Sequence, residues 1–128
     1  MAPISVTLAR RDPPAAVVAL IGEHDVYSSE RLENEFAVLL DEGRHVVVDL
    51  RDTTFVDSTT LSVLLGARHQ AERASLGFAL VLPEREHTQV HRILDLTGLV
   101  STFATYNRLD DALAAARAGV IGQPVKAA

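Results

Sequence analysis

The chain has 128 residues, the usual length of one domain, so the sequence predicts a single folded unit. Hydrophobic residues make up 48% and charged residues 23%, a balance that is typical of a globular fold and argues against disorder. The formal net charge of −5 disfavours binding to nucleic acid and to anionic membranes, and the lack of cysteine excludes disulfides, thiolate metal sites and thiol catalysis. The longest apolar run, residues 15–21, is far shorter than the roughly 20 residues of a membrane helix, and the first residues are not those expected of a signal peptide. We therefore expect a cytoplasmic protein without membrane insertion.

The first predicted elements are two neighbouring strands. Apolar and polar residues alternate over residues 6–10 before Asp12, Pro13 and Pro14 end the pattern, which predicts an edge strand. Residues 16–21 are apolar at every position, as in a strand that is covered on both faces. We therefore place this second strand in the interior of a sheet.

A helix and a further buried strand are predicted next. Ser28 is the expected N-cap, Glu30 suits the first turn and Gly43 closes the helix. Its apolar residues recur at helical spacing: Leu32, Phe36, Leu39 and Leu40. Residues 46–50 then form a buried strand, and the order strand, helix, strand implies a parallel pair with a right-handed crossover.

The same unit repeats in the middle of the chain. A second helix is predicted to run from Ser58 to the vicinity of Gly77, and residues 78–82 form a third buried strand. Its apolar stripe consists of Leu61, Leu64, Leu65 and Ala71.

The last third predicts two short helices around a short strand. One helix carries Val90, Ile93 and Leu94 and stops at Gly98, and residues 102–106 form the strand. Asn107 is the expected cap of the final helix, whose first turn holds two acidic residues. The fold class is thus α/β: one domain over residues 1–118, with a small mixed sheet of about four to five strands, about four helices packed against it, and a flexible tail over residues 119–128.

Residues 51–61, between a buried strand and the second helix, are rich in hydroxyl groups. The cluster over residues 57–60 lies where a helix start presents free backbone N–H groups. A structural role is helix capping, since Asp, Ser and Thr are favoured N-cap residues. A functional role is phosphorylation, because a phosphate at a helix N-terminus changes the surface without damaging the core. Residue spacing alone leaves both roles open.

Three motifs in order resemble those of the STAS domain, and of the stand-alone bacterial anti-sigma factor antagonists in particular. They are Gly22-Glu23-His24-Asp25, the run from Val46 to Leu50 with Phe55-Val56-Asp57-Ser58-Thr59-Thr60-Leu61, and Ile93-Leu94-Asp95-Leu96-Thr97-Gly98-Leu99. The resemblance extends from about Val6 to Ala116. It implies a protein that catalyses nothing itself, needs no cofactor, and binds an anti-sigma factor with serine/threonine kinase activity until that kinase phosphorylates it. A serine/threonine phosphatase reverses the modification.

Matching the family motif residue by residue assigns candidate site residues. Thr59 matches the usual phosphoacceptor and is the first candidate, and Ser58 is the second. Thr60 stands where many members have glycine, and we expect its branched side chain to crowd the surface that a kinase approaches. Asp25 matches an acidic position near the acceptor, although an Asp in such a turn commonly binds backbone N–H groups. The expected partner-binding residues are Asp25, Asp57, Ser58, Thr59, Thr60 and Leu61.

Two other functions compete with this switch. A scaffold or adaptor subunit, in a stress-signalling complex or beside a transporter, would use the same surface without being modified. A small hydrolase would need a concave pocket, which short loops do not provide, and the Gly-x-Ser-x-Gly nucleophile motif is absent.

Metal, nucleotide and nucleic-acid sites have weaker support. His87 and His91 have the spacing of two ligands on one helix face, but no third ligand follows by spacing, so we expect no metal. Glycine-rich phosphate loops are missing. The remaining positive charges are expected on two helices as a solvated face with ion pairs: Arg68, Arg73, Arg85 and Arg92.

Overall fold

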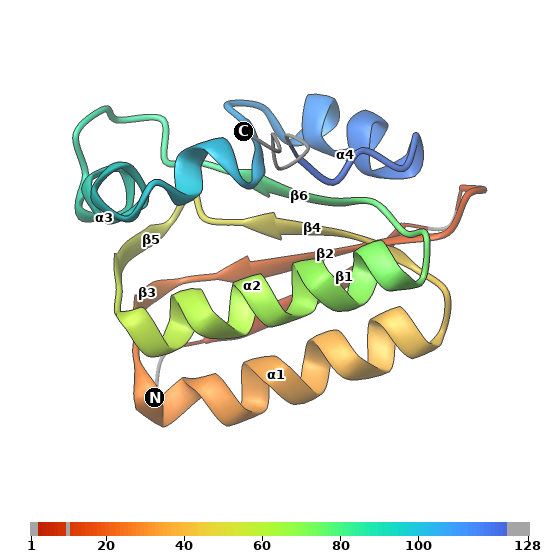
Figure 1. Ribbon diagram of the computed structural model, residues 1–128, viewed down its shortest axis with the longest axis horizontal. Helices are drawn as coiled ribbons and strands as arrows, with labels where there is room; N and C mark the ends of the chain where they lie inside the picture. Colours follow the sequence, from red (N-terminus) through yellow and green to blue (C-terminus); the bar gives the residue numbers. More distant parts are fainter. Residues whose placement is uncertain (1–2, 10, 123–128) are drawn as a thin grey trace, which may run out of the picture.

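The computed structural model describes residues 3–9 and 11–122, and a five-stranded sheet forms its centre (Figure 1). The strand order is β1-β2-β4-β6-β7; β1 is antiparallel to β2, and the other pairs are parallel. The bounds are β1 Ile4–Ala9, β2 Ala15–Leu20, β4 His45–Asp49, β6 Phe78–Val81 and β7 Ala104–Tyr106. This mixed sheet confirms the predicted α/β class, including the edge position of the first strand.

Helices cover both faces of the sheet. The helices are α1 Val26–Asp41, α2 Ser58–Arg73, α3 Gln89–Thr97 and α4 Leu109–Arg117, with a short 3₁₀ helix at Leu99–Ser101. Helices α1 and α2 run side by side over one face (Figure 1). Val46 and Val48 belong to the larger core on this face. Val47 points to the opposite face and packs in a smaller core with α4. The alternation follows from the period of two of a strand that is buried on both sides.

The structure also contains a second, two-stranded sheet, which the sequence did not predict. Strand β3, Gly22–His24, pairs in parallel with β5, Thr53–Val56, beyond the ends of β2 and β4. Both strands are only three or four residues long, so neither shows an alternating pattern that could be recognised. The motif over residues 22–25 therefore contains a strand, although the sequence indicated a turn.

Several helix ends differ from the prediction. Helix α1 is capped by Asp25 and not by Ser28, which is buried within the first turn. The residue at the N-cap of α4 is Arg108, so Asn107 does not cap it. Helix α2 ends at Arg73, well before Gly77. Gly77 serves close packing instead, because a Cβ atom there would lie 1.9 Å from the carbonyl oxygen of Ala116.

The first residues of the predicted tail are part of the packed structure. The carbonyl of Val120 accepts a hydrogen bond from the Phe78 N–H at 3.0 Å, and the carbonyl of Ile121 accepts one from Arg68 Nε at 2.9 Å. These contacts reach Ile121, and the rest of the predicted tail, residues 123–128, lies outside the described residues. Across residues 3–9 and 11–122, no helix combines the length and the apolar character that crossing a membrane requires.

Candidate site at two helix N-termini

The small β3–β5 sheet places the N-termini of two helices next to each other. His24 and Val56 are register partners in this sheet. The residue after each of them, Asp25 and Asp57, is the N-cap of α1 and of α2, respectively. The Asp57 N–H also donates to the His24 carbonyl at 3.2 Å. Asp25 and Asp57 thus come together at one end of the molecule, although 31 residues separate them in the sequence.

The candidate phosphoacceptors form the first turn of α2. The Asp57 carboxylate accepts a hydrogen bond from the Thr60 N–H at 2.8 Å, which is the usual N-cap arrangement. Ser58 is exposed and Thr59 is half-buried. The backbone N–H groups at such a helix start have no partner within the helix, and their positive partial charge favours a phosphate.

Thr60 and Leu61 do not lie on this surface. Both are buried, because the helical repeat that starts at the Asp57 cap turns them toward the core together with Leu64. The expectation that Thr60 crowds the approach of a kinase is therefore wrong. The Thr60 hydroxyl oxygen is also buried without a hydrogen-bond partner.

Asp25 has the capping role that its position in the turn suggested. Its carboxylate accepts a hydrogen bond from the Tyr27 N–H at 2.9 Å, and the side chain stays half-exposed. Capping satisfies one donor and leaves the remaining carboxylate surface open, so the position also adds negative charge near the start of α2.

His24 lies directly beneath the two caps and was not identified from the sequence as a site residue. The side chain is fully buried, with Nδ1 3.0 Å from the Ser28 hydroxyl and Nε2 3.2 Å from the Ile21 carbonyl oxygen. Burial lowers the pKa of His24 below its usual 6.5, although the Ile21 carbonyl and the Asp25 carboxylate act in the opposite direction. The imidazole is therefore held neutral near pH 7.

Gln89 fixes the outer edge of β5. Its side-chain oxygen accepts from the Val56 N–H at 2.9 Å, and its side-chain nitrogen donates to the Val56 carbonyl at 2.8 Å. The amide thus satisfies the backbone of the residue before the Asp57 cap as a neighbouring strand would. The sequence offered no signal for this contact, which joins residues 33 positions apart.

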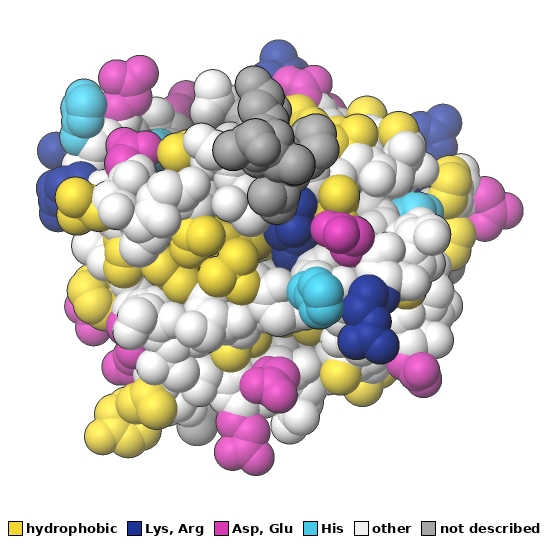
Figure 2. All heavy atoms as spheres, viewed as in Figure 1, with side chains coloured by type: hydrophobic (Ala, Val, Ile, Leu, Met, Phe, Trp, Pro, Cys, Tyr) yellow, Lys and Arg dark blue, Asp and Glu magenta, His cyan; other side chains and the backbone are white. Residues whose placement is uncertain are grey.

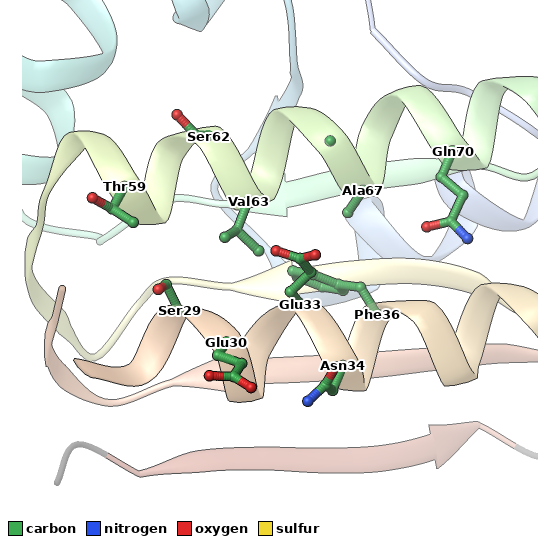
Figure 3. Close-up of a pocket in the computed structure, with 11 residues that line it drawn as sticks. Ser29, Glu30, Glu33, Asn34, Phe36, Thr59, Ser62, Val63, Ala67 and Gln70 are labelled. Carbon is green, nitrogen blue, oxygen red and sulfur yellow. The ribbon is translucent and has the colours of Figure 1, made fainter. Parts of the chain in front are cut away.

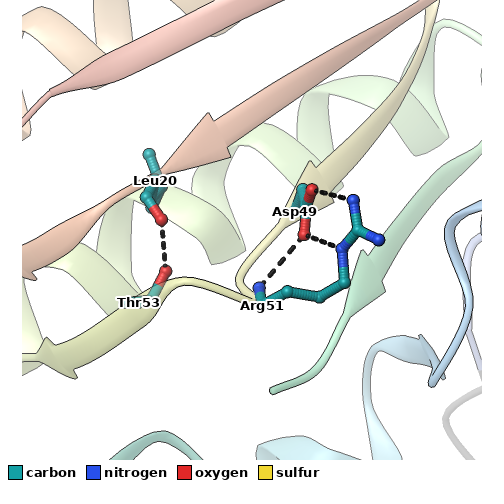
Figure 4. Close-up of polar contacts among 4 residues, drawn as sticks. All are labelled: Leu20, Asp49, Arg51 and Thr53. Atoms are coloured by element: carbon teal, nitrogen blue, oxygen red, sulfur yellow. Dashed lines mark hydrogen bonds and ion pairs between the residues drawn. The ribbon is translucent and has the colours of Figure 1, made fainter. Parts of the chain in front are cut away.

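Figure 4 shows the contacts that hold the loop between β4 and β5. The Thr53 hydroxyl donates to the Leu20 carbonyl at 2.7 Å, and Arg51 binds both carboxylate oxygens of Asp49, at 2.9 and 2.8 Å. Burial acts to raise the pKa of the Asp49 carboxyl, but the hydrogen bonds from the Arg51 side chain and backbone more than offset this and lower it. The loop that leads to the candidate acceptors is therefore anchored on both sides.

A groove runs between α1 and α2 from Thr59 toward the C-terminal half of α2. Its volume is about 640 Å³. Figure 3 shows the polar side chains of α1 along one bank and those of α2 along the other. The lining residues are Ser29, Glu30, Glu33, Asn34, Phe36, Thr59, Ser62, Val63, Gly66, Ala67 and Gln70. Of this set, the sequence singled out only Thr59 as a candidate site residue.

Comparison with known proteins identifies the family. The family model of the STAS domain matches residues 7–112. The chain belongs to the STAS domain family. It is 31% identical to the anti-sigma F factor antagonist of Paenibacillus polymyxa over 99 residues, which are 76% of this chain and 82% of that one. It is 33% identical to the anti-sigma-B factor antagonist of Bacillus subtilis (strain 168) over 82 residues, which are 64% and 72% of the two chains.

A solved structure agrees with this assignment. The crystal structure of an anti-sigma factor antagonist from Mycobacterium paratuberculosis superimposes on this STAS domain with a TM-score of 0.73 and 30% sequence identity. The match covers 90% of this chain and 95% of the other. The resemblance to anti-sigma factor antagonists is therefore confirmed in sequence and in fold.

The histidine pair and some of the arginines that the sequence singled out are arranged differently from the prediction. His87 and His91 do not share a helix face, because His87 precedes α3 with a φ of 60° and His91 completes a capping box with Thr88. Within residues 3–9 and 11–122, no three potential ligands group around a metal position. Arg73 and Arg92 are exposed on helices as expected. Arg68 is buried against Ile121 although it forms an ion pair with Glu72, and Arg85 lies outside the helices.

Proposed function

We propose that this STAS domain is an anti-sigma factor antagonist that works by partner switching. In its unphosphorylated form it binds an anti-sigma factor that is also a serine/threonine kinase, and so releases the sigma factor for transcription. Phosphorylation at Thr59, or alternatively at Ser58, ends the complex, and a serine/threonine phosphatase restores the active form. The chain itself is a cytoplasmic regulator that uses no cofactor and performs no catalysis.

One observation carries this proposal: two accessible hydroxyl side chains lie in the first turn of α2, beside the Asp57 cap. A phosphate on either one meets a helix N-terminus and no buried group, so the domain stays folded. The relatives named as antagonists support the choice of partner. The burial of Thr60 supports it further, because the one departure from the family motif leaves the acceptor surface open.

Phosphorylation alters this surface through charge and hydration. A phosphate adds a charge of about −1.5 to −2 at neutral pH. Asp57 and Asp25 already place two carboxylates at this end of the molecule, and the formal net charge of the chain is −5. Docking the partner over the modified turn then requires removing water from a dianion, which opposes the complex.

The deciding experiment is peptide mass analysis of the protein isolated from its native cells under several growth and stress conditions. Trypsin releases residues 52–68 as one peptide, which contains both candidate acceptors. We expect one phosphate on Thr59 or Ser58 and none in a Ser58→Ala/Thr59→Ala double variant. An unmodified peptide under every condition would overturn the switch and favour an unmodified scaffold subunit.

The second step is recovery of the partner with the tagged wild-type chain. We expect an anti-sigma factor kinase in the complex, and we expect added ATP to release it. Release should fail for the double variant, which cannot accept the phosphate. A complex that ATP leaves intact for the wild-type chain would contradict partner switching.

A further inference from the structure

The groove between α1 and α2 contains a glycine that the fold does not require. Gly66 lies in the middle of α2 and is exposed. A Cβ atom at this position would meet nothing within 4 Å, and the residue does not have a positive φ. Gly77 and Gly122 differ, because a Cβ atom at either would strike backbone atoms. Glycine in a helix interior lowers helix stability relative to alanine, so the isolated domain loses stability at Gly66 without any packing gain.

The position of Gly66 explains this loss if another molecule packs against α2. Thr59, Ser62, Val63, Gly66 and Gln70 follow one another at helical spacing and form one bank of the groove. From Thr59 to Gln70 this bank is about 16 Å long, at about 1.5 Å per residue. The missing side chain allows close approach to the helix backbone halfway along it. The groove thus has the length to seat a short segment of a protein.

The charges of the groove define the chemistry of that segment. Glu30 and Glu33 on α1 are exposed and are the only charged side chains among the described residues that line it. Figure 3 shows the Glu33 carboxylate between the two helices, opposite Val63 and Ala67. Carboxylates on one bank with an apolar and small-residue wall on the other complement a segment that carries both Lys or Arg and small apolar side chains.

The geometry points to the α1–α2 groove as the binding site for a basic segment of the anti-sigma factor, which packs against α2 at Gly66. This inference rests on the proposed function and adds a surface that extends beyond the acceptor turn. Thr59 lines one end of the same groove, so its phosphate and the water bound to it occupy space that the segment needs. Modification at one end of the groove therefore affects the whole bound segment.

The test combines the stability of the free domain with its affinity for the purified anti-sigma factor recovered as described above. We expect Gly66→Ala to raise the melting temperature by roughly 2–6 °C, because alanine is the better helix former. We expect the same variant to weaken binding roughly fivefold or more, because the added methyl group separates the two surfaces. A merely structural glycine would shift stability without this opposite shift in affinity. His69→Ala, exposed on the same helix and outside the groove, is the control.

A charge variant tests the other bank. Glu33→Gln should weaken binding roughly two- to fivefold at low salt, with a smaller effect at high salt, whereas Asp41→Asn at the end of α1 should not. Unchanged affinity of both groove variants, or a fall in stability of Gly66→Ala, would overturn the groove. A wild-type chain that binds no anti-sigma factor would overturn the proposed function, and the groove inference with it. If Gly66→Ala and Glu33→Gln bind the anti-sigma factor as tightly as the wild type and ATP still releases them, only the groove inference is overturned.

Discussion

The hydroxyl of Thr60 is a polar group that the fold buries without a partner. Leaving such a group unsatisfied costs about 1–3 kcal/mol, whereas an apolar group of the same shape costs nothing comparable. We therefore expect Thr60→Val to raise the free energy of unfolding by about 1 kcal/mol in urea denaturation. The matched change is Thr53→Val, which removes a buried hydroxyl that donates to the Leu20 carbonyl and should lower stability by about the same amount. If both substitutions lowered the free energy of unfolding, the Thr60 hydroxyl would have a hydrogen-bond partner and the assignment would be wrong.

His24 makes the stability of the domain depend on pH. Because burial lowers the pKa of the folded imidazole below 6.5, the unfolded chain takes up a proton first as the pH falls. The contribution of His24 to the free energy of unfolding is then at its maximum above about pH 6.5 and decreases as the pH drops below that value. Burial, with a smaller contribution from Arg117, lowers the pKa of His45 as well and adds to the same slope.

We expect the free energy of unfolding of the wild-type chain to fall between pH 7 and pH 5. Urea denaturation at a series of pH values measures this change. His24→Gln should be less stable at pH 7 but should lose less of its stability toward pH 5. His69→Gln, which changes an exposed histidine, should keep the wild-type slope. A His24→Gln slope equal to that of the wild type would show that His24 does not carry the effect.

Short elements, more than long ones, build the candidate site. Strands β3 and β5 bring the caps of α1 and α2 together, and the Gln89 amide of α3 holds the outer edge of β5. None of these contacts follows from periodicity, because each joins a three- or four-residue strand to a distant residue. The positions of the long helices and buried strands were predicted correctly, since their apolar repeats extend over several turns or cover a whole strand, although several helix ends were not.

Gln89→Ala should loosen the link between α3 and β5. The change leaves the Val56 N–H and carbonyl without their side-chain partners, and we expect a loss of about 1–3 kcal/mol. Hydrogen exchange of the Val56 amide should accelerate more than exchange in β4, because the opening is local. Gln70→Ala on exposed α2 surface should leave both measurements near the wild-type values. Unchanged protection of the Val56 amide in Gln89→Ala would show that the Gln89 side chain does not hold β5 in place.

At the scale of the whole molecule, the domain is expected to act as a rigid body whose surface charge is changed at one end. Thr59→Asp places a carboxylate in the first turn of α2, where the helix dipole favours it, so the melting temperature should not fall. The same substitution should weaken binding to the anti-sigma factor, whereas Thr59→Ala should stay bound in the presence of ATP. Affinity and thermal melting are measured on the same samples. If both variants bind and respond to ATP like the wild type, Thr59 is not the acceptor.

The sequence by itself determined the fold class, the order of the long elements and the hydroxyl cluster at the start of α2. These features depend on local patterns: apolar periodicity, turn residues and capping residues close together in the chain. Only the tertiary structure decided which cluster residues are accessible, because the phase of α2 relative to the core turns Thr60 and Leu61 inward and leaves Ser58 exposed. It also decided that the α1–α2 groove and the His24 and Gln89 contacts exist. Such contacts join residues far apart in the chain, and they form only when the helices and strands pack in three dimensions.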